Sequence, residues 1–247
     1  MDKLLYVAMS GAKEAMYLQN VQANNLANVD TVGFKADFAQ ARAMHVMGDG
    51  WDSRAYAMTE RPGSHFESGA LDYTGRDLDL AINGDGWFVV LDKNGEEAFT
   101  RAGNLFVDAQ GFVTTHDGHV LMGNAGPLVL PEYEKLEIGV DGTITVRALG
   151  QGPDALVEVD RMKLVKPDAS VLQKGEDGLF RRTDTAAYEP PDFTVRVSTG
   201  TLERSNVNAV GAMLSVMGAA RQFEMQVKLM GKAEEMDAAA SQGMKLT

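Results

Sequence analysis

The sequence has no cysteine among its 247 residues, and it has only seven prolines and two tryptophans. A disulfide framework and a thiolate metal site are therefore excluded. Two uncharged stretches, residues 15–29 and 206–220, are shorter than the roughly 20 apolar residues of a membrane-spanning helix, and both contain asparagine. We therefore expect no segment embedded in lipid.

Basic charge is scarce, because 23 Lys and Arg residues stand against 35 Asp and Glu residues and the formal net charge is −12. The first 28 residues and the residues from 206 onward each carry equal numbers of acidic and basic side chains, so the acidic excess lies in the middle of the chain. Binding to nucleic-acid phosphates requires a basic face. We therefore expect no nucleic-acid partner.

Patterns typical of catalysis are missing. The chain has neither the Gly-x-Ser-x-Gly motif of hydrolases nor a phosphate loop that ends in Gly-Lys-Ser or Gly-Lys-Thr. Gly84 and Gly86 lack the third glycine and the following helix of a dinucleotide-binding fingerprint. Without cysteine, and with only four scattered histidines, nucleophilic catalysis has few candidates. We expect that the protein is not an enzyme and binds no cofactor.

Two clusters resemble metal sites only loosely. His116 and His119 lie three residues apart in a glycine-containing turn, which is not the helical spacing of a zinc motif, so we expect a surface hairpin turn. Asp77, Asp79 and Asp85 lie near two glycines but lack the ligand spacing and the terminal glutamate of an EF-hand. We expect a solvated turn there and no bound metal.

Both ends of the chain have the periodicity of helices, at residues 3–28 and from an N-cap at Ser205-Asn206 to about Ala240. The apolar steps of four and three are typical of a coiled-coil seam. Uncharged side chains surround both helices and indicate burial on several faces, although an ordinary packing of two helices beside a sheet also explains the seams. The seam positions are Leu5, Met9, Ala12, Met16, Gln19, Ala23 and Leu26 in the first helix and Met213, Val216, Ala220, Phe223, Val227 and Met230 in the second.

The middle of the chain is strand-like. Short apolar runs alternate with turn residues, and Asn94-Gly95 and Asp141-Gly142 predict two hairpins. We therefore expect an α+β fold, with a mainly-β, Greek-key or barrel-like body inserted between N- and C-terminal α-helices that pair as an antiparallel coiled coil. The expected parts are the N-terminal helix, an extended connector with a loop at residues 48–50, the β-rich domain and the C-terminal helix, at residues 1–33, 34–62, 63–199 and 200–247.

Three separated blocks of the sequence form a recognisable pattern that covers nearly the whole chain. The matching residues are Ser10, Gly11, Asn24, Asn25, Ala27, Asn28, Thr31, Gly33, Phe34 and Lys35; then 74–75, 78–79, 81–82, 84–88 and 100–104; then Gly200, Leu202, Glu203, Ser205, Asn206, Val207, Arg221, Phe223 and Glu224. In this order the blocks resemble the rod and hook family, the axial proteins of the bacterial flagellum. Within that family, residues 1–12 are most similar to the proximal-rod type.

The resemblance implies a structural subunit of the proximal rod of the flagellar basal body, with a distal-rod or hook-type paralogue as the alternative. It also implies that the terminal helices form an inner domain, that the β domain forms an outer layer, and that copies polymerise into a torque-transmitting tube around an export channel. A secreted β-domain binding module is an alternative of a different class, and it would need no apolar helices at both ends.

The implied partners are other copies of the chain, other flagellar rod proteins and the flagellar type III export apparatus. The family is exported without a cleaved signal peptide, which implies a periplasmic rod. The short apolar stretch at residues 4–9 and the acidic Asp2 also argue against a cleaved signal.

The candidate assembly interface combines the helix seams with three asparagines that could either bridge subunits or cap the first helix. Its residues are Leu5, Met9, Ala12, Met16, Asn24, Asn25, Leu26, Asn28, Met213, Val216, Met217, Ala220, Phe223, Val227 and Met230.

Overall fold

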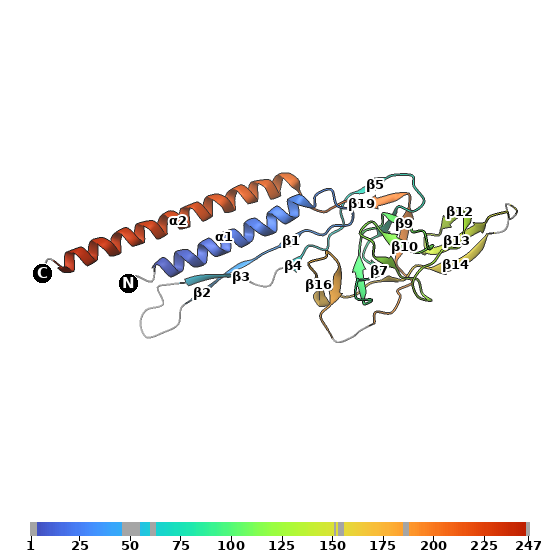
Figure 1. Cartoon of the computed structure of the whole chain (residues 1–247), viewed down its shortest axis with the longest axis horizontal. Helices are drawn as coiled ribbons and strands as arrows, with labels where there is room; N and C mark the ends of the chain where they lie inside the picture. Colours follow the sequence, from blue (N-terminus) through green and yellow to red (C-terminus); the bar gives the residue numbers. More distant parts are fainter. Residues whose placement is uncertain are drawn as a thin grey trace. The chain divides into compact units, whose positions relative to one another are not determined.

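Figure 1 shows the computed structural model of the chain, which describes residues 4–45, 55–59, 63–150, 152, 156–184 and 188–245. The chain divides into two compact units, each built from separate segments. Unit 1 consists of Met1–Asn28, Asp37–Gly63 and Val207–Thr247, and unit 2 consists of Val29–Ala36 and Ser64–Asn206. The chain therefore passes between the units four times.

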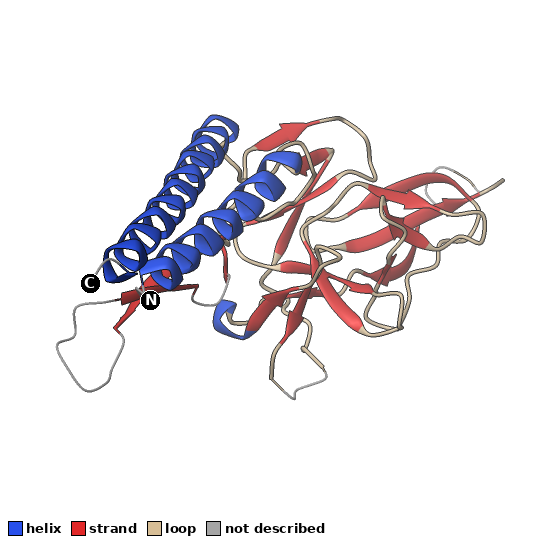
Figure 2. Cartoon of the chain, turned by 60° about the vertical axis from the view of Figure 1, so that its left-hand side comes forward, coloured by secondary structure: helices blue, strands red, loops and turns tan. Residues whose placement is uncertain are grey.

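Unit 1 contains the two expected terminal helices, α1 (Leu4–Ala27) and α2 (Ala209–Lys245). They lie side by side and run in opposite directions (Figures 1 and 2). The expected N-cap of the second helix is wrong, because the side-chain oxygen of Asn208 accepts a hydrogen bond from the backbone N–H of Gly211 at 3.0 Å. The helix begins later than expected because Asn206 is engaged in contacts of unit 2 that are described below.

The helices meet through small side chains. The fully buried apolar residues of α1 are Ala8, Ala12 and Ala15. A Cβ atom at Gly11 of α1 would lie 2.9 Å from Nε2 of Gln226 in α2, so the Gln226 side chain packs against Gly11. The buried alanines of α2 are Ala212, Ala219 and Ala233.

Strands also lie in residues 37–63 of unit 1, where the sequence predicts an extended connector at residues 34–62. Strand β2 (Ala41–His45) pairs antiparallel with β3 (Ala55–Thr59), and β3 contacts α1. Strand β1 (Asp37–Phe38) pairs with β4 (Gly63–Ser64). The loop expected at residues 48–50 lies outside the described residues.

Unit 2 is built around an eight-stranded sheet with the order β16-β17-β8-β7-β11-β10-β9, in which β15 also pairs with β7. Because side chains alternate along a strand, β7 sends Phe88 and Val90 into one hydrophobic cluster and Trp87 and Val89 into another. The strands are β7 (Trp87–Leu91), β8 (Glu97–Thr100), β9 (Leu105–Val107), β10 (Val113–Thr115), β11 (Val120–Leu121), β15 (Leu164–Val165), β16 (Leu172–Lys174) and β17 (Phe180–Arg182).

Smaller sheets complete unit 2. A three-stranded sheet has the order β12-β13-β14, β18 pairs with β6, and β19 pairs with β5. A short 3₁₀ helix, η1 (Ala169–Val171), precedes β16. The strands are β5 (Leu71–Tyr73), β6 (Leu80–Asn83), β12 (Tyr133–Ile138), β13 (Thr143–Ala148), β14 (Val157–Arg161), β18 (Arg196–Thr199) and β19 (Thr201–Glu203).

Both predicted hairpins are confirmed. Strands β7 and β8 flank the turn at Gly95, which has φ 82°, and strands β12 and β13 flank the turn at Gly142, which has φ 85°. Glycine suits both turns because other residues rarely adopt positive φ. The local turn chemistry therefore sets these two registers.

The α+β class, with a mainly-β body between two terminal helices, is confirmed. No sheet formed by the described strands closes on itself, so the expected Greek-key or barrel-like arrangement is not confirmed. None of the helices in the described part of the chain is both long enough and apolar enough to cross a lipid bilayer.

Candidate assembly interface and buried ion cluster

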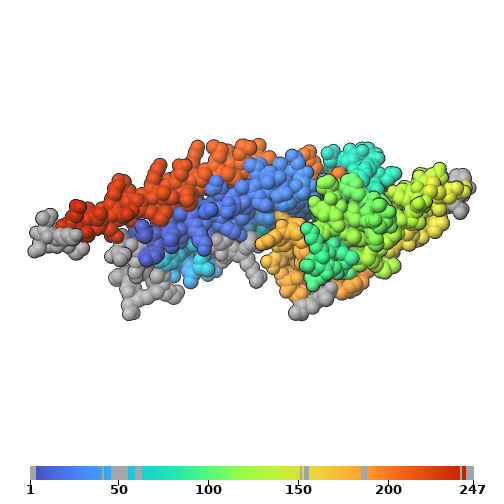
Figure 3. Space-filling view, in the orientation of Figure 1, coloured from blue at the N-terminus to red at the C-terminus, as the bar shows by residue number. Residues whose placement is uncertain are grey.

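Apolar side chains remain exposed along both helices of unit 1. Figure 3 shows one face of unit 1, on which side chains of α1 (blue) and α2 (orange to red) lie at the surface. The apolar side chains of Met9 and Met217 are 53% and 49% exposed. The exposed members of the predicted interface are Leu5, Met9, Met16, Met213, Met217, Phe223 and Val227.

The other predicted interface residues are less accessible. Ala12 is buried, and Leu26, Val216, Ala220 and Met230 are half-buried. The predicted coiled-coil seam follows one face of each helix. It therefore missed further exposed apolar residues on other faces. These are Tyr6, Val210, Leu214, Met225, Leu229 and Met236.

The three asparagines near the end of α1 have different surroundings. Asn25 is buried, and its side-chain amide bonds to both backbone groups of Asp37. Asn28 donates from Nδ2 to the carbonyl oxygen of Asn24 at 2.9 Å, which caps the last turn of the helix. Asn24 itself is exposed.

Unit 2 contains a buried ion cluster formed by Lys35, Arg101 and Glu203, which are 1%, 3% and 1% exposed. Lys35 donates from Nζ to Oε1 of Glu203 at 2.7 Å, and Arg101 donates from Nη1 to Oε2 of Glu203 at 2.9 Å. Each residue belongs to a different one of the three sequence blocks. The blocks therefore converge on one site, which their separation along the chain does not reveal.

Backbone groups supply further partners to this cluster. Lys35 also donates to the carbonyl oxygen of Glu67 at 2.9 Å, and Arg101 donates from Nη2 to that of Gly84 at 2.7 Å. The guanidinium of Arg101 lies 5.4 Å from the ring centroid of Trp87, which suits a cation–π contact. Burial lowers the pKa of Lys35, and its hydrogen bond and charge interaction with Glu203 oppose that shift.

Glycines allow the backbone to approach this cluster. Gly33 has φ 68°, and a Cβ atom there would lie 2.3 Å from the carbonyl carbon of Arg101. A Cβ atom at Gly69 would lie 1.9 Å from the carbonyl oxygen of Arg204. Both distances are shorter than any contact between non-bonded atoms allows, so larger residues would displace the backbone.

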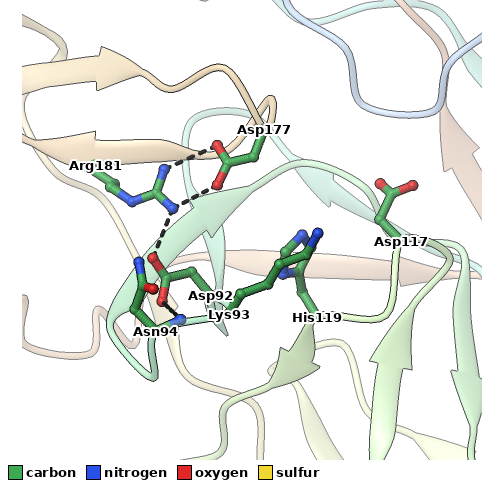
Figure 4. A pocket seen from close by; sticks show the side chains of 7 residues that line it. All are labelled: Asp92, Lys93, Asn94, Asp117, His119, Asp177 and Arg181. Carbon is green, nitrogen blue, oxygen red and sulfur yellow. Dashed lines mark hydrogen bonds and ion pairs between the residues drawn. The ribbon is translucent and has the colours of Figure 1, made fainter.

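A separate polar pocket of about 510 Å³ lies in unit 2 (Figure 4). Arg181 bonds to Asp92 at 2.8 Å and to Asp177 at 2.6 Å, so two carboxylates already neutralise its charge. The hydrogen bond from Arg181, followed by that from the backbone N–H of Glu96, lowers the pKa of Asp92 to about 2. The residues that line the pocket are Asp92, Lys93, Asn94, Asp117, His119, Asp177 and Arg181.

The two weak metal motifs are not simple surface turns. Strands β10 and β11 pair across the expected hairpin turn, in which His116 is exposed. His119 is only 6% exposed, so the expected surface position is wrong for this residue. Asp77 and Asp85 are exposed, but Asp79 is buried and accepts a hydrogen bond from Oγ1 of Thr74 at 2.7 Å. Among the described residues, no group of three or more His, Asp or Glu side chains is placed to hold a metal ion.

Comparisons with known families match the same three regions. The family described as flagella basal body rod protein matches residues 5–35, and the flagellar hook protein FlgE/F/G D1 domain matches residues 81–146. The flagellar basal body rod FlgEFG protein C-terminal family matches residues 198–243. Lys35, Arg101 and Glu203 each lie within one of these matches.

Relatives match over the full length of the chain. The flagellar basal-body rod protein FlgF of Escherichia coli strain K12 is 40% identical over 247 residues, and FlgF of Salmonella typhimurium strain LT2 is 39% identical, each with 98% of both chains covered. The rod protein FlgG of Bacillus subtilis strain 168 is 33% identical over 259 residues, with 96% of this chain and 97% of the relative covered. The chain therefore belongs to the flagellar basal-body rod proteins, and it is a structural subunit of that rod rather than an enzyme.

Proposed function

We propose that the chain is a proximal-rod subunit whose terminal helices join those of other copies and of neighbouring rod proteins. The resulting tube would enclose the export channel and transmit torque. The 40% identity to a FlgF protein, against 33% to a FlgG protein, favours the proximal rod over a distal-rod or hook-type role.

The pairing of α1 with α2 is proposed as an antiparallel coiled coil. Ala212, Ala219 and Ala233 fall at intervals of seven residues or a multiple of seven, which is the repeat of a coiled coil. Ala8 and Ala15 of α1 are also seven residues apart and buried. Small residues at these positions allow a close approach of the two helices.

The exposed apolar residues carry the proposal. The buried apolar residues of both helices are alanines, whereas the large side chains of Met9, Met16, Met213 and Met217 stay exposed within one chain. Burial of apolar surface contributes about 25 cal/mol per Å². Methionine also adapts to irregular partners. Neighbouring helices would bury this surface in a polymer whose repeated contacts do not close into a ring.

Export and location extend the same proposal. The chain would leave the cytoplasm unfolded through the flagellar type III apparatus and assemble in the periplasm.

The test places a charge on the exposed surface of α2. Met217→Asp should leave unit 2 folded and the chain exported, but it should stop incorporation into rods and abolish swimming. The reason is that an unpaired charge buried between subunits costs roughly 3–5 kcal/mol. The measurement is motility together with the presence of the variant in purified basal bodies.

The matched control is Leu149→Asp, because Leu149 is an exposed apolar residue of unit 2, at 61%. A strain that carries Leu149→Asp should swim normally. Normal swimming of the Met217→Asp strain, with the variant present in purified rods, would contradict the proposed interface. Absence of the wild-type chain from purified basal bodies would contradict the proposed place in the rod.

A further inference from the structure

The chain segments that lead into and out of unit 1 are gathered at one place within unit 2. The four passages between the units follow residues 28, 36, 63 and 206. In unit 2, two of these passages are the two ends of residues 29–36. The other two passages are the beginning and the end of residues 64–206, so three segments of unit 2 are involved. Contacts among these three segments therefore determine whether the passages stay together.

Glu203 joins all three segments. Its Oε1 accepts hydrogen bonds from Nζ of Lys35 at 2.7 Å and from the backbone N–H of Gly69 at 3.0 Å. Its backbone oxygen accepts from the N–H of Gly33 at 2.7 Å. Its Oε2 binds Arg101, which anchors the group to the sheets of unit 2.

Asn206 repeats this arrangement three residues later. Its Oδ1 accepts from the backbone N–H of Ala36 at 2.7 Å, and its Nδ2 donates to the carbonyl oxygens of His65 and Glu67, each at 2.9 Å. A single side chain thus satisfies backbone groups of both other segments.

The charges of the ion cluster make Glu203 its central member. Two buried cations, Lys35 and Arg101, share one carboxylate. Loss of Lys35 leaves a neutral Arg101–Glu203 pair, whereas loss of the Glu203 charge leaves two buried cations without a counter-charge. Breaking a buried pair by removing one partner is strongly destabilising.

We propose that Lys35, Arg101, Glu203 and Asn206 form a clamp that binds the passages into one bundle, so that force passes between the units through the bundle rather than through single strands of backbone. The clamp lies outside the helix surfaces that carry the proposed assembly. Its mechanical role rests on the proposed function as a rod subunit, whereas its existence does not.

Hydrogen exchange of the full chain tests the clamp directly. Glu203→Gln keeps the shape of the side chain and removes its charge. We expect the amides of Gly33, Ala36 and Gly69 to exchange roughly tenfold faster or more in this variant, while amides of the main sheet change little. Unchanged exchange at all three amides would overturn the proposal.

The matched control is Glu97→Gln. Glu97 accepts two hydrogen bonds from Lys163, at 2.7 and 2.8 Å, and Lys163 is only 3% exposed, but this pair touches none of the passages. Glu97→Gln should destabilise unit 2 without selective exchange at Gly33, Ala36 and Gly69. Equal acceleration in the two variants would show ordinary destabilisation and overturn the clamp.

A double variant tests the charge argument. Lys35→Met in the Glu203→Gln background removes one of two uncompensated cations, so exchange at Ala36 should slow relative to Glu203→Gln alone. Further acceleration in the double variant would overturn the assignment of Glu203 as the shared counter-charge.

Swimming in a viscous medium tests the mechanical role. Glu203→Gln should assemble into rods but lose swimming speed under load, and Glu97→Gln should not. Accelerated exchange with unchanged swimming under load would overturn this role. Failure of the rod assignment itself is recognised separately, because the wild-type chain would then be absent from purified basal bodies.

Discussion

Asn25 holds the end of α1 to the backbone of Asp37 through two hydrogen bonds. Its Nδ2 donates to the carbonyl oxygen of Asp37 at 2.7 Å, and its Oδ1 accepts from the N–H of Asp37 at 2.8 Å. The side chain is 3% exposed. One amide therefore satisfies both backbone groups of a residue in β1.

Asn25→Ala should destabilise unit 1, because it leaves a donor and an acceptor of the backbone without these partners. A buried polar group left unsatisfied costs about 1–3 kcal/mol. Thermal unfolding followed by the helical circular dichroism signal measures the loss. Asn24→Ala is the control, because Asn24 is the exposed neighbour in the same helix, and an equal loss in both variants would contradict the assignment.

Ala15→Leu should disrupt a packed contact of α1, because Ala15 is only 1% exposed. Added methylenes in a packed contact cost about 1–3 kcal/mol. Ala23→Leu makes the same change at an exposed position of the same helix, where it should cost little. Equal helix stability of the two purified variants, measured by chemical denaturation, would show that the alanines do not form the contact.

Gly103→Ala should destabilise unit 2 through direct overlap. A Cβ atom at this position would lie 1.8 Å from the carbonyl oxygen of Leu80, which is a backbone atom and cannot move away as the end of a flexible side chain could. Gly84→Ala is the control, because Gly84 has φ 78° but open space around the new Cβ. Positive φ alone costs roughly 1–2 kcal/mol, so Gly103→Ala should lower the unfolding temperature more; the reverse order would refute the close approach.

The stability contributed by Asp92 should depend on pH in a defined window. The folded-state pKa of Asp92 is about 2, below the model-compound value of 3.8, so the unfolded chain binds the proton more tightly. The contribution is therefore complete above pH 3.8 and is lost as the pH falls through about 2. Asp92→Asn should reduce the unfolding temperature at pH 7, and the difference from wild type should shrink toward pH 2.

Asp117→Asn is the control for this pH dependence. Asp117 lines the same pocket and is exposed, so its substitution should have little effect at neutral pH. A difference between Asp92→Asn and wild type that stays constant down to pH 2 would contradict the role of the Arg181 hydrogen bond.

Local patterns determined much of this protein. The helices at both ends follow from a periodicity contained in neighbouring residues, and the hairpins at Gly95 and Gly142 follow from turn residues that tolerate positive φ. The family blocks likewise lie within short stretches of the sequence. In each case the residues that decide the outcome are close together in the chain.

The tertiary structure alone decided which side of each helix is covered. Apolar residues lie on several faces of α1, so several stripes fit the periodicity equally well. Only the packing shows that Ala8 and Ala15 are buried while Met9 and Met16 stay exposed. The same holds for His119, which a local glycine turn suggested to be exposed but which is buried in unit 2.

Contacts between residues far apart in the chain could not be predicted from the sequence either. Asn206 fits an N-cap by its type and position, but its amide is committed to Ala36, His65 and Glu67, and the helix begins after Asn208 instead. Lys35 and Glu203 stand 168 residues apart and meet at 2.7 Å. No periodicity or turn signal links residues at such separation, because their contact exists only after the two ends of unit 2 have been brought together by folding.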